Sequence, residues 1–138
     1  MKIRDVYQRY TARHETVGPE APIADVIASV ARDRGSRAVF VVDESQALSG
    51  IIRMDEILRR LGSKHLPERG FMSASDILGT RAKDLMIEPL SVAPEDDVDD
   101  ALRIAVRFDL EDLPVVQDGK VVGQIDCFEM LHALQSAG

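Results

Sequence analysis

The stretch "VVGQIDCFEML", from Val121 to Leu131, decides the fold of this chain. A short apolar run meets a glycine, continues to an isoleucine and then passes directly into a helical pattern. The same frame occurs once more, as "LSGIIRMDEIL" from Leu48 to Leu58. Both stretches read Gly, any residue, Ile, a charged residue, two more residues, Glu, an apolar residue and Leu. Two matched strand–glycine–helix junctions in a short chain predict an internal duplication.

The duplication extends well beyond these two junctions. Residues 17–43 align with residues 92–118 at an offset of 75, and after a two-residue gap the offset becomes 73. The segments that precede the copies also agree, because "IRDVY" at 3–7 resembles "AKDLM" at 82–86. The sequence therefore predicts a tandem repeat in which both copies share one order of elements.

The hydrophobic pattern predicts that order as β-α-β-β-α. Apolar residues at 23–31 and 98–106 recur at i, i+3, i+4, i+7 and i+8, the spacing of one helix face. A two-residue hairpin is predicted at Asp118-Gly119, and the longer "DESQA" serves as the turn of the first copy. The other elements are short strands at 15–17 and 90–92, strands at 38–42 and 113–117, a further strand entering each junction, and closing helices at 54–61 and 127–134.

One unit of this kind is too small to bury both faces of its sheet, so the two copies are expected to pack together. The fold class predicted is α/β (α+β), with tandem β-α-β-β-α repeats related by a pseudo-two-fold axis. The first copy spans 1–61, a linker with a short helix spans 62–80, and the second copy spans 81–138.

Composition narrows the class of protein. The formal net charge of −7 argues against a nucleic-acid partner, because phosphate backbones need clustered Lys and Arg. A single cysteine, Cys127, permits no internal disulfide, and its repeat partner Met54 marks the position as apolar filler. The longest apolar run, "AVFVV" at 38–42, is too short to span a bilayer. We expect a cytoplasmic protein without a membrane anchor.

This ordered set of motifs resembles the CBS-domain pair, or Bateman module, over nearly the whole chain. The resemblance rests on "RDVY" and "KDLM", on "VGPEAPI" and "VAPEDDV", and on the hairpins "AVFVVDESQALSGII" and "LPVVQDGKVVGQI". It implies a standalone regulatory module that binds an adenosine-containing ligand in the cleft between its copies. The ligands implied are AMP, ADP, ATP or S-adenosylmethionine, and no cofactor is required. The regulated partner would be a separate chain.

The family's ligand motif is a glycine, two mostly apolar residues, Thr or Ser, two more residues and Asp. The resemblance implies that the glycine lets the backbone approach the ligand, that the hydroxyl meets phosphate and that the carboxylate holds the ribose. The positions in this sequence are departures: the hydroxyl is replaced by Arg53 and Asp126, and the carboxylate by Glu56 and Glu129. The backbone near Val17 and Ala38 is expected to flank the base.

These departures predict an asymmetric pair of sites. Arg53 favours phosphate through a charge-assisted contact, whereas Asp126 repels phosphate and leaves its copy suited to a cationic ligand. Each residue also has a simpler interpretation. Asp126 suits the N-cap of a helix, and first-turn acids such as Glu56 and Glu129 are stabilised by the helix dipole alone.

Two other classes of function stay open beside ligand sensing. One is a structural dimerisation module with degenerate, ligand-free pockets, and the other is an enzyme, which we do not expect because no nucleophile–base pair, phosphate loop or metal constellation occurs. A homodimer is expected from the apolar positions of the closing helices, which are Ile57, Leu58, Leu61, Met130, Leu131 and Leu134.

Overall fold

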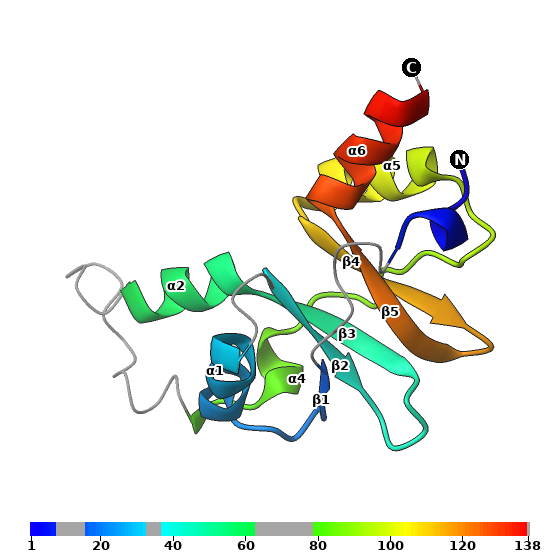
Figure 1. The fold of residues 1–138 in the computed structure, drawn as a ribbon. Coiled ribbons are helices and arrows are strands. Elements are labelled where there is room, and N and C mark those ends of the chain that lie inside the picture. Colours follow the sequence, from blue (N-terminus) through cyan, green and yellow to red (C-terminus); the bar gives the residue numbers. More distant parts are fainter. Residues whose placement is uncertain (8–15, 33–36, 63–78, 138) are drawn as a thin grey trace.

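The computed structural model describes residues 1–7, 16–32, 37–62 and 79–137 (Figure 1). Two sheets lie side by side, one three-stranded in the order β1-β2-β3 and one two-stranded with β4 beside β5. The described elements are η1 (Ile3–Asp5), β1 (Thr16–Val17), α1 (Ile23–Arg32), β2 (Ala38–Val42), β3 (Leu48–Arg53), α2 (Met54–Gly62), α4 (Ala82–Leu85), α5 (Val98–Phe108), β4 (Asp112–Gln117), β5 (Lys120–Asp126) and α6 (Cys127–Ala137). The predicted α/β fold with repeated units is confirmed.

The expected strand at 90–92 is wrong in extent. Val92 forms only an isolated parallel bridge with Val115, whereas β1 of the first copy pairs with β2 over two residues. The predicted Asp118-Gly119 turn is confirmed, because both residues have positive φ, 52° and 77°, as a two-residue hairpin of type I′ requires. The short helix expected in the linker falls within 63–78, outside the described residues.

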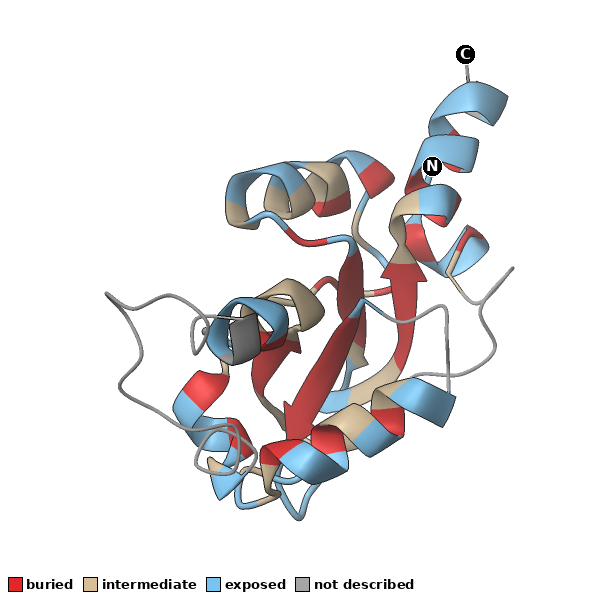
Figure 2. Cartoon of the chain, turned by 90° about the vertical axis from the view of Figure 1, so that its left-hand side faces the viewer, coloured by how far each residue is buried: buried red, intermediate tan, exposed pale blue. Residues whose placement is uncertain are grey.

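Strand β2 explains how the two sheets share a core. All five of its residues are buried, although successive side chains of a strand point to opposite faces. Ala38 and Phe40 face the second copy and pack in one cluster with Leu113 and Ile125. The alternate residues pack with α1 and α4 of the other cluster. Figure 2 shows the strands buried in the centre and the outer faces of the helices exposed.

The two long helices confirm the repeat position by position. Ile23 and Val26 on α1 are buried, as are their counterparts Val98 and Ala101 on α5. The next two stripe positions are half-buried in both copies, and the last, Ala31 and Val106, is exposed in both. The amphipathic pattern therefore places both helices against equivalent surfaces.

The segment that precedes each copy packs against the other copy. The first segment, 1–7, contacts the second copy: Ile3 N–H donates to Asp96 O at 2.8 Å and Arg4 N–H donates to Pro94 O at 2.9 Å. The second segment, 79–87, repeats these bonds on the first copy, where Ala82 N–H donates to Ala21 O and Lys83 N–H donates to Pro19 O. In Figure 1 the N-terminal helix accordingly lies beside α5 and α6, and α4 lies beside α1 and β1. Each copy is completed by the leading segment of the other.

One contact marks the pseudo-two-fold axis. Arg37 N–H donates to Asp112 Oδ2 at 2.6 Å, and these residues are repeat counterparts at the offset of 75. Counterparts of a two-fold arrangement meet only near its axis. The contact joins the starts of β2 and β4 and places the interface between the copies at this point.

None of the helices in the described part of the chain has the length and apolar content needed to cross a bilayer.

Candidate functional site

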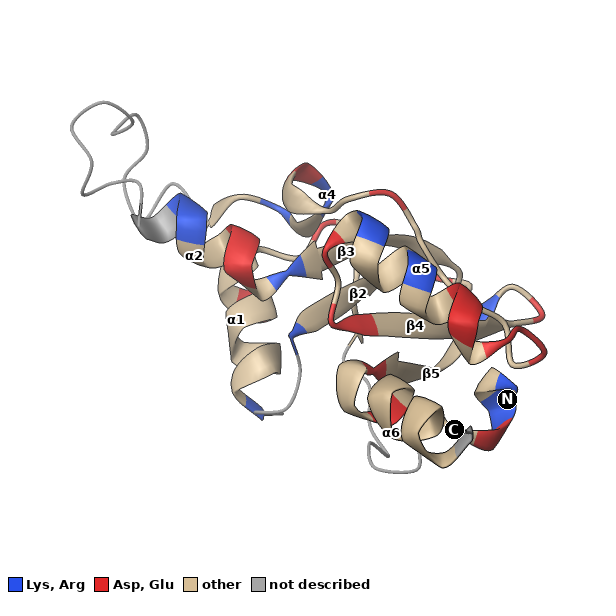
Figure 3. Cartoon of the chain, turned by 90° about the horizontal axis from the view of Figure 1, so that it is seen from above, with Lys and Arg blue, Asp and Glu red and all other residues tan. Residues whose placement is uncertain are grey.

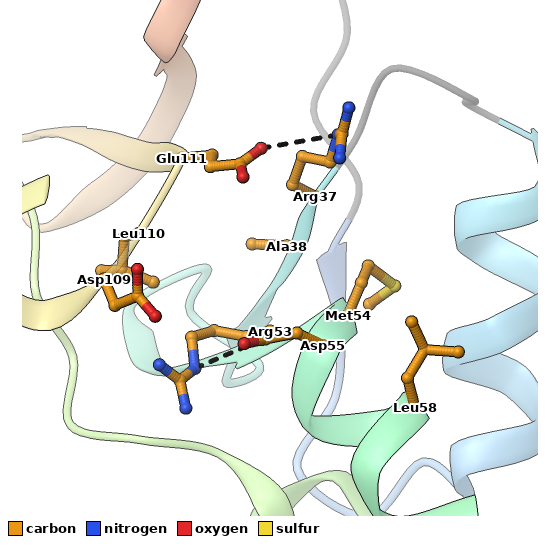
Figure 4. Close-up of a pocket in the computed structure, with 9 residues that line it drawn as sticks. All are labelled: Arg37, Ala38, Arg53, Met54, Asp55, Leu58, Asp109, Leu110 and Glu111. Carbon is orange, nitrogen blue, oxygen red and sulfur yellow. Dashed lines mark ion pairs between the residues drawn. The ribbon is translucent and has the colours of Figure 1, made fainter. Parts of the chain in front are cut away.

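A cavity of about 230 Å³ lies between the two copies, beside the start of β2 and the end of β3. The first copy contributes most of its wall and the second copy contributes the loop between α5 and β4 (Figure 4). Its lining residues are Arg37, Ala38, Arg53, Met54, Asp55, Leu58, Asp109, Leu110 and Glu111. Two residues expected at a ligand site, Arg53 and Ala38, are therefore brought together at one cavity.

Arg53 is the last residue of β3 and spans the interface. Its side chain is only 19% exposed. Its guanidinium donates to Phe108 O at 3.5 Å, the carbonyl that ends α5 in the second copy. A cation at the C-terminal end of a helix is favoured by free carbonyls and by the helix dipole. Arg53 thus holds the copies together at the cavity.

The Arg53 Nε atom is buried and has no hydrogen-bond partner among the described residues. The nearest carboxylate oxygen, Asp55 Oδ1, lies at 3.7 Å, which is an ion-pair distance and too long for a hydrogen bond. A buried donor without an acceptor costs about 1–3 kcal/mol.

Acidic residues face the two arginines. Glu111 Oε2 lies 3.5 Å from Arg37 Nε, and Figure 4 shows this pair and the Arg53–Asp55 pair on opposite sides of Ala38. Asp109 adopts a left-handed conformation with φ 56° at the end of α5, where its N–H donates to Ala105 O. Among the described residues, the lining carries two basic and three acidic side chains. Figure 3 shows basic positions on α2, β3 and α5 interspersed with acidic positions on α2, α5 and β4.

Glu56 lies in the first turn of α2 and does not line the cavity itself. Its Oε1 accepts from Arg60 Nε at 3.0 Å, and its Oε2 lies 3.8 Å from the Arg53 guanidinium. The Glu56 side chain is 23% exposed. It lies next to Arg53, the expected phosphate partner, and its two oxygens already interact with Arg60 and Arg53. Its ribose contact stays a prediction.

Asp126 and Glu129 bind each other at the start of α6. Asp126 Oδ1 accepts from Glu129 N–H at 2.8 Å, and Glu129 Oε1 accepts from Asp126 N–H at 3.1 Å. This reciprocal pair is a capping box, which satisfies free N–H groups of the helix. Glu129 is fully buried. Both carboxylates therefore have a structural task. For Asp126 it is the helix cap that the simpler interpretation predicted, whereas the return bond from Glu129 was not predicted.

A counterpart of this cavity at the second copy would include residues that lie outside the described ranges. The repeat counterparts of 109–111 are 34–36, which belong to the range left undescribed. Val17 lies apart from the described cavity and borders an open hollow with Val42 and Glu44 at the other end of β2. The structure therefore does not bring Val17 to Arg53 and Ala38.

The sequence did not single out Arg37, Asp109 or Glu111. Their place at the cavity depends on the packing of the second copy's α5–β4 loop against the first copy, which one-dimensional periodicity does not encode. The repeat alignment carried one signal, because it pairs Arg37 with Asp112 across the expected axis.

Asp112 is a buried carboxylate next to the cavity. Burial raises the pKa of Asp112 to about 6, and nearby Asp126 and Glu111 act in the same direction. The hydrogen bond from Arg37 N–H and the positive charge of Arg37 oppose this rise. Burial also raises the pKa of the half-buried Cys127 thiol, which keeps it protonated. A protonated thiol is a poor nucleophile.

Gly50 is required for a close contact within the protein, and the ligand approach that the motif implies stays a prediction. A side chain at this position would place its Cβ 2.6 Å from Ile87 O and 2.6 Å from Met86 Sδ. The close approach that requires glycine here is to the second leading segment, 79–87, which pairs with β3 through Ile51 and Ile87. The motif glycine serves the exchange of leading segments, and Gly50 does not line the cavity.

Metal ligation finds no support in this part of the molecule. Among the described residues, no three His, Cys, Asp or Glu side chains converge in a way that could hold a metal ion.

The comparison with known structures agrees with this architecture. A CBS domain-containing protein from Thermotoga maritima superposes with a TM-score of 0.83 at 25% identity, over 99% of this chain and 95% of the other. The CBS-domain containing protein of Agrobacterium tumefaciens gives a TM-score of 0.77 at 18% identity, over 97% and 99% of the two chains. CBSX2, whose structure is a complex with AMP, gives 0.72 at 23% identity, over 99% and 97%.

Among proteins with curated descriptions, none matches this chain in sequence. The family model of the CBS domain matches twice, at residues 3–63 and 82–136, once over each copy. Each match includes the strands, the two helices and the junction motif that define the repeat. The chain therefore belongs to the CBS-domain family, as a pair of CBS domains.

Proposed function

We propose that this chain is a regulatory module that senses an adenosine-containing nucleotide in the cavity between its two CBS domains. The observation that carries the proposal is the Arg53 side chain, a cation that lines the cavity and joins the two copies through Phe108 O. Both copies line the cavity, so an occupant would contact both at once. Binding would thereby change how tightly the copies are held together.

The parts of a nucleotide find complementary groups here. A phosphate oxygen accepts from the Arg53 guanidinium, which lines the cavity. Glu56, three residues further along, turns from Arg60 to accept from the ribose hydroxyls. Ala38, Met54 and Leu58 supply apolar surface for the base. Ligand pockets usually measure about 300–1,000 Å³, so a cavity of about 230 Å³ suits a mononucleotide better than a larger ligand.

The test is AMP binding measured by calorimetry and by thermal shift. AMP should raise the melting temperature, because a ligand that binds only the folded state stabilises it. Arg53→Ala should weaken AMP binding about ten-fold or more, since each 1.4 kcal/mol is a factor of ten. Arg103→Ala, an exposed arginine of α5 paired with Asp100, is the matched control and should bind AMP as the wild type does. Full affinity in Arg53→Ala would contradict the proposal.

A second candidate function is a structural dimerisation module without ligand. It is favoured by apolar side chains exposed on the closing helices: Leu58 is 70% exposed, Phe128 70%, Leu131 57% and Leu134 43%. Ile57 and Met130, in contrast, are buried in the chain's own core. The Leu61 side chain lies outside the described residues.

The exposed apolar positions lead us to propose a homodimer in either case, because apolar surface of this kind marks an interface. Light scattering should give twice the mass of the chain, and Leu131→Glu should shift it toward the monomer. A monomer mass at high concentration would exclude the dimer. Dimerisation without any thermal shift from adenosine ligands would favour the structural module.

A further inference from the structure

Among the described residues that line the cavity, acidic side chains outnumber basic ones. Arg37 is already engaged by Glu111 at 3.5 Å. Arg53 lies 3.7 Å from Asp55 and 3.8 Å from Glu56. Each of these two arginines therefore has an acidic neighbour before any ligand enters.

The wall supplied by the second copy is more acidic still. Asp109 has no ion pair among the described residues, and it follows the C-terminal end of α5, where the helix dipole is negative. Glu111 lies two residues further along the same wall. A ligand group that extends past Arg53 toward this wall meets two carboxylates and the end of a helix.

We infer that Asp109 and Glu111 make the cavity selective by charge, so that it accepts an adenosine ligand with one phosphate or none and rejects ATP. This inference rests on the proposed function. A first phosphate is matched by Arg53, whereas each further phosphate adds negative charge near the acidic wall. ATP carries about two more negative charges than AMP near pH 7. At an effective dielectric constant of about 20, two unit charges some 8 Å apart repel by about 2 kcal/mol, roughly thirty-fold in affinity.

The test compares adenosine, AMP and ATP by calorimetry in magnesium-free buffer with a chelator, so that no cation neutralises the phosphates. The wild type should bind AMP at least about ten-fold more tightly than ATP. Asp109→Asn and Glu111→Gln together should raise ATP affinity at least about three-fold relative to AMP. Asparagine suits the left-handed backbone at position 109, so the first change leaves the end of α5 intact.

The matched control is Glu44→Gln, which removes one exposed carboxylate near the far end of β2. It should leave the ratio of AMP to ATP affinity unchanged. A salt titration of the wild type tests the same point without a variant. The ratio of AMP affinity to ATP affinity should fall from low to high salt, because salt screens the repulsion between the ATP phosphates and the acidic wall.

Three outcomes would overturn the inference alone. The first is equal affinity for AMP and ATP in the wild type. The second is a ratio of AMP to ATP affinity that is the same in the double variant as in the wild type, and the third is a fall in that ratio in Glu44→Gln as large as in the double variant. Failure to bind adenosine, AMP and ATP alike would overturn the proposed function and this inference with it. Thermal melts of each variant show whether it is folded before its affinities are compared.

Discussion

At the scale of single residues, Asp112 shows what a buried charge costs at the junction of the two copies. The carboxylate is 1% exposed, and its pKa of about 6 exceeds its ordinary value of 3.8. The folded protein therefore holds this proton more tightly than the unfolded chain. Stability contributed by the protonated form is present below about pH 4 and is lost as the pH rises to about 6.

The first prediction follows for Asp112→Asn. Asparagine keeps an oxygen acceptor for Arg37 N–H but removes the charge, so the variant should escape the loss of stability at higher pH. Relative to the wild type, its free energy of unfolding should increase by about 2 kcal/mol between pH 4 and pH 7. Urea denaturation of both proteins at several pH values measures this. A difference that stays constant with pH would contradict the assignment.

At the scale of elements, β3 and the second leading segment, 79–87, pack closely because Gly50 has no side chain. Gly50→Ala forces its Cβ against Ile87 O, a backbone atom that cannot rotate away. We expect a loss of about 1–3 kcal/mol in the free energy of unfolding, the usual cost of overpacking. Gly18→Ala is the control, since its Cβ would meet no heavy atom within 4 Å. Equal stability of the two variants by urea denaturation would argue against this fit.

The elements themselves were largely predictable from the sequence. The helical stripes at 23–31 and 98–106 and the Asp118-Gly119 turn depend on local periodicity and backbone preference, which the sequence carries directly. The strand at 90–92 failed because its single bridge, Val92 with Val115, is decided by tertiary pairing. The cavity was half predictable: the ligand motif implied by the family resemblance marked Arg53, but the wall with Asp109 and Glu111 comes from the other copy.

At the scale of the whole molecule, the exchanged leading segments predict that the two halves do not fold apart. Ile3 and Val6 are buried against the second copy, and Ala82 and Leu85 against the first. Burying two aliphatic side chains contributes about 3–6 kcal/mol, a large part of the 5–15 kcal/mol typical of a domain.

Fragments 1–70 and 71–138 should therefore each lack a cooperative thermal transition by circular dichroism. Mixed in equal amounts, they should regain one, because each again finds the leading segment that covers it. A fragment that melts cooperatively by itself, near the melting temperature of the intact chain, would show that the exchange is not needed for folding.

The exchanged leading segments also constrain how such a chain arises. A single copy folded alone would have an uncovered core, so an ancestor with one copy needed a second identical chain to supply the missing segment. In that symmetric pair both clefts carried the same residue at every position. Fusion of the two genes kept the mutual covering and freed the halves to diverge. One half can therefore have Arg53 where the equivalent position of the other half has Asp126. The difference between these two counterpart residues is thus a property that only the fused chain can inherit.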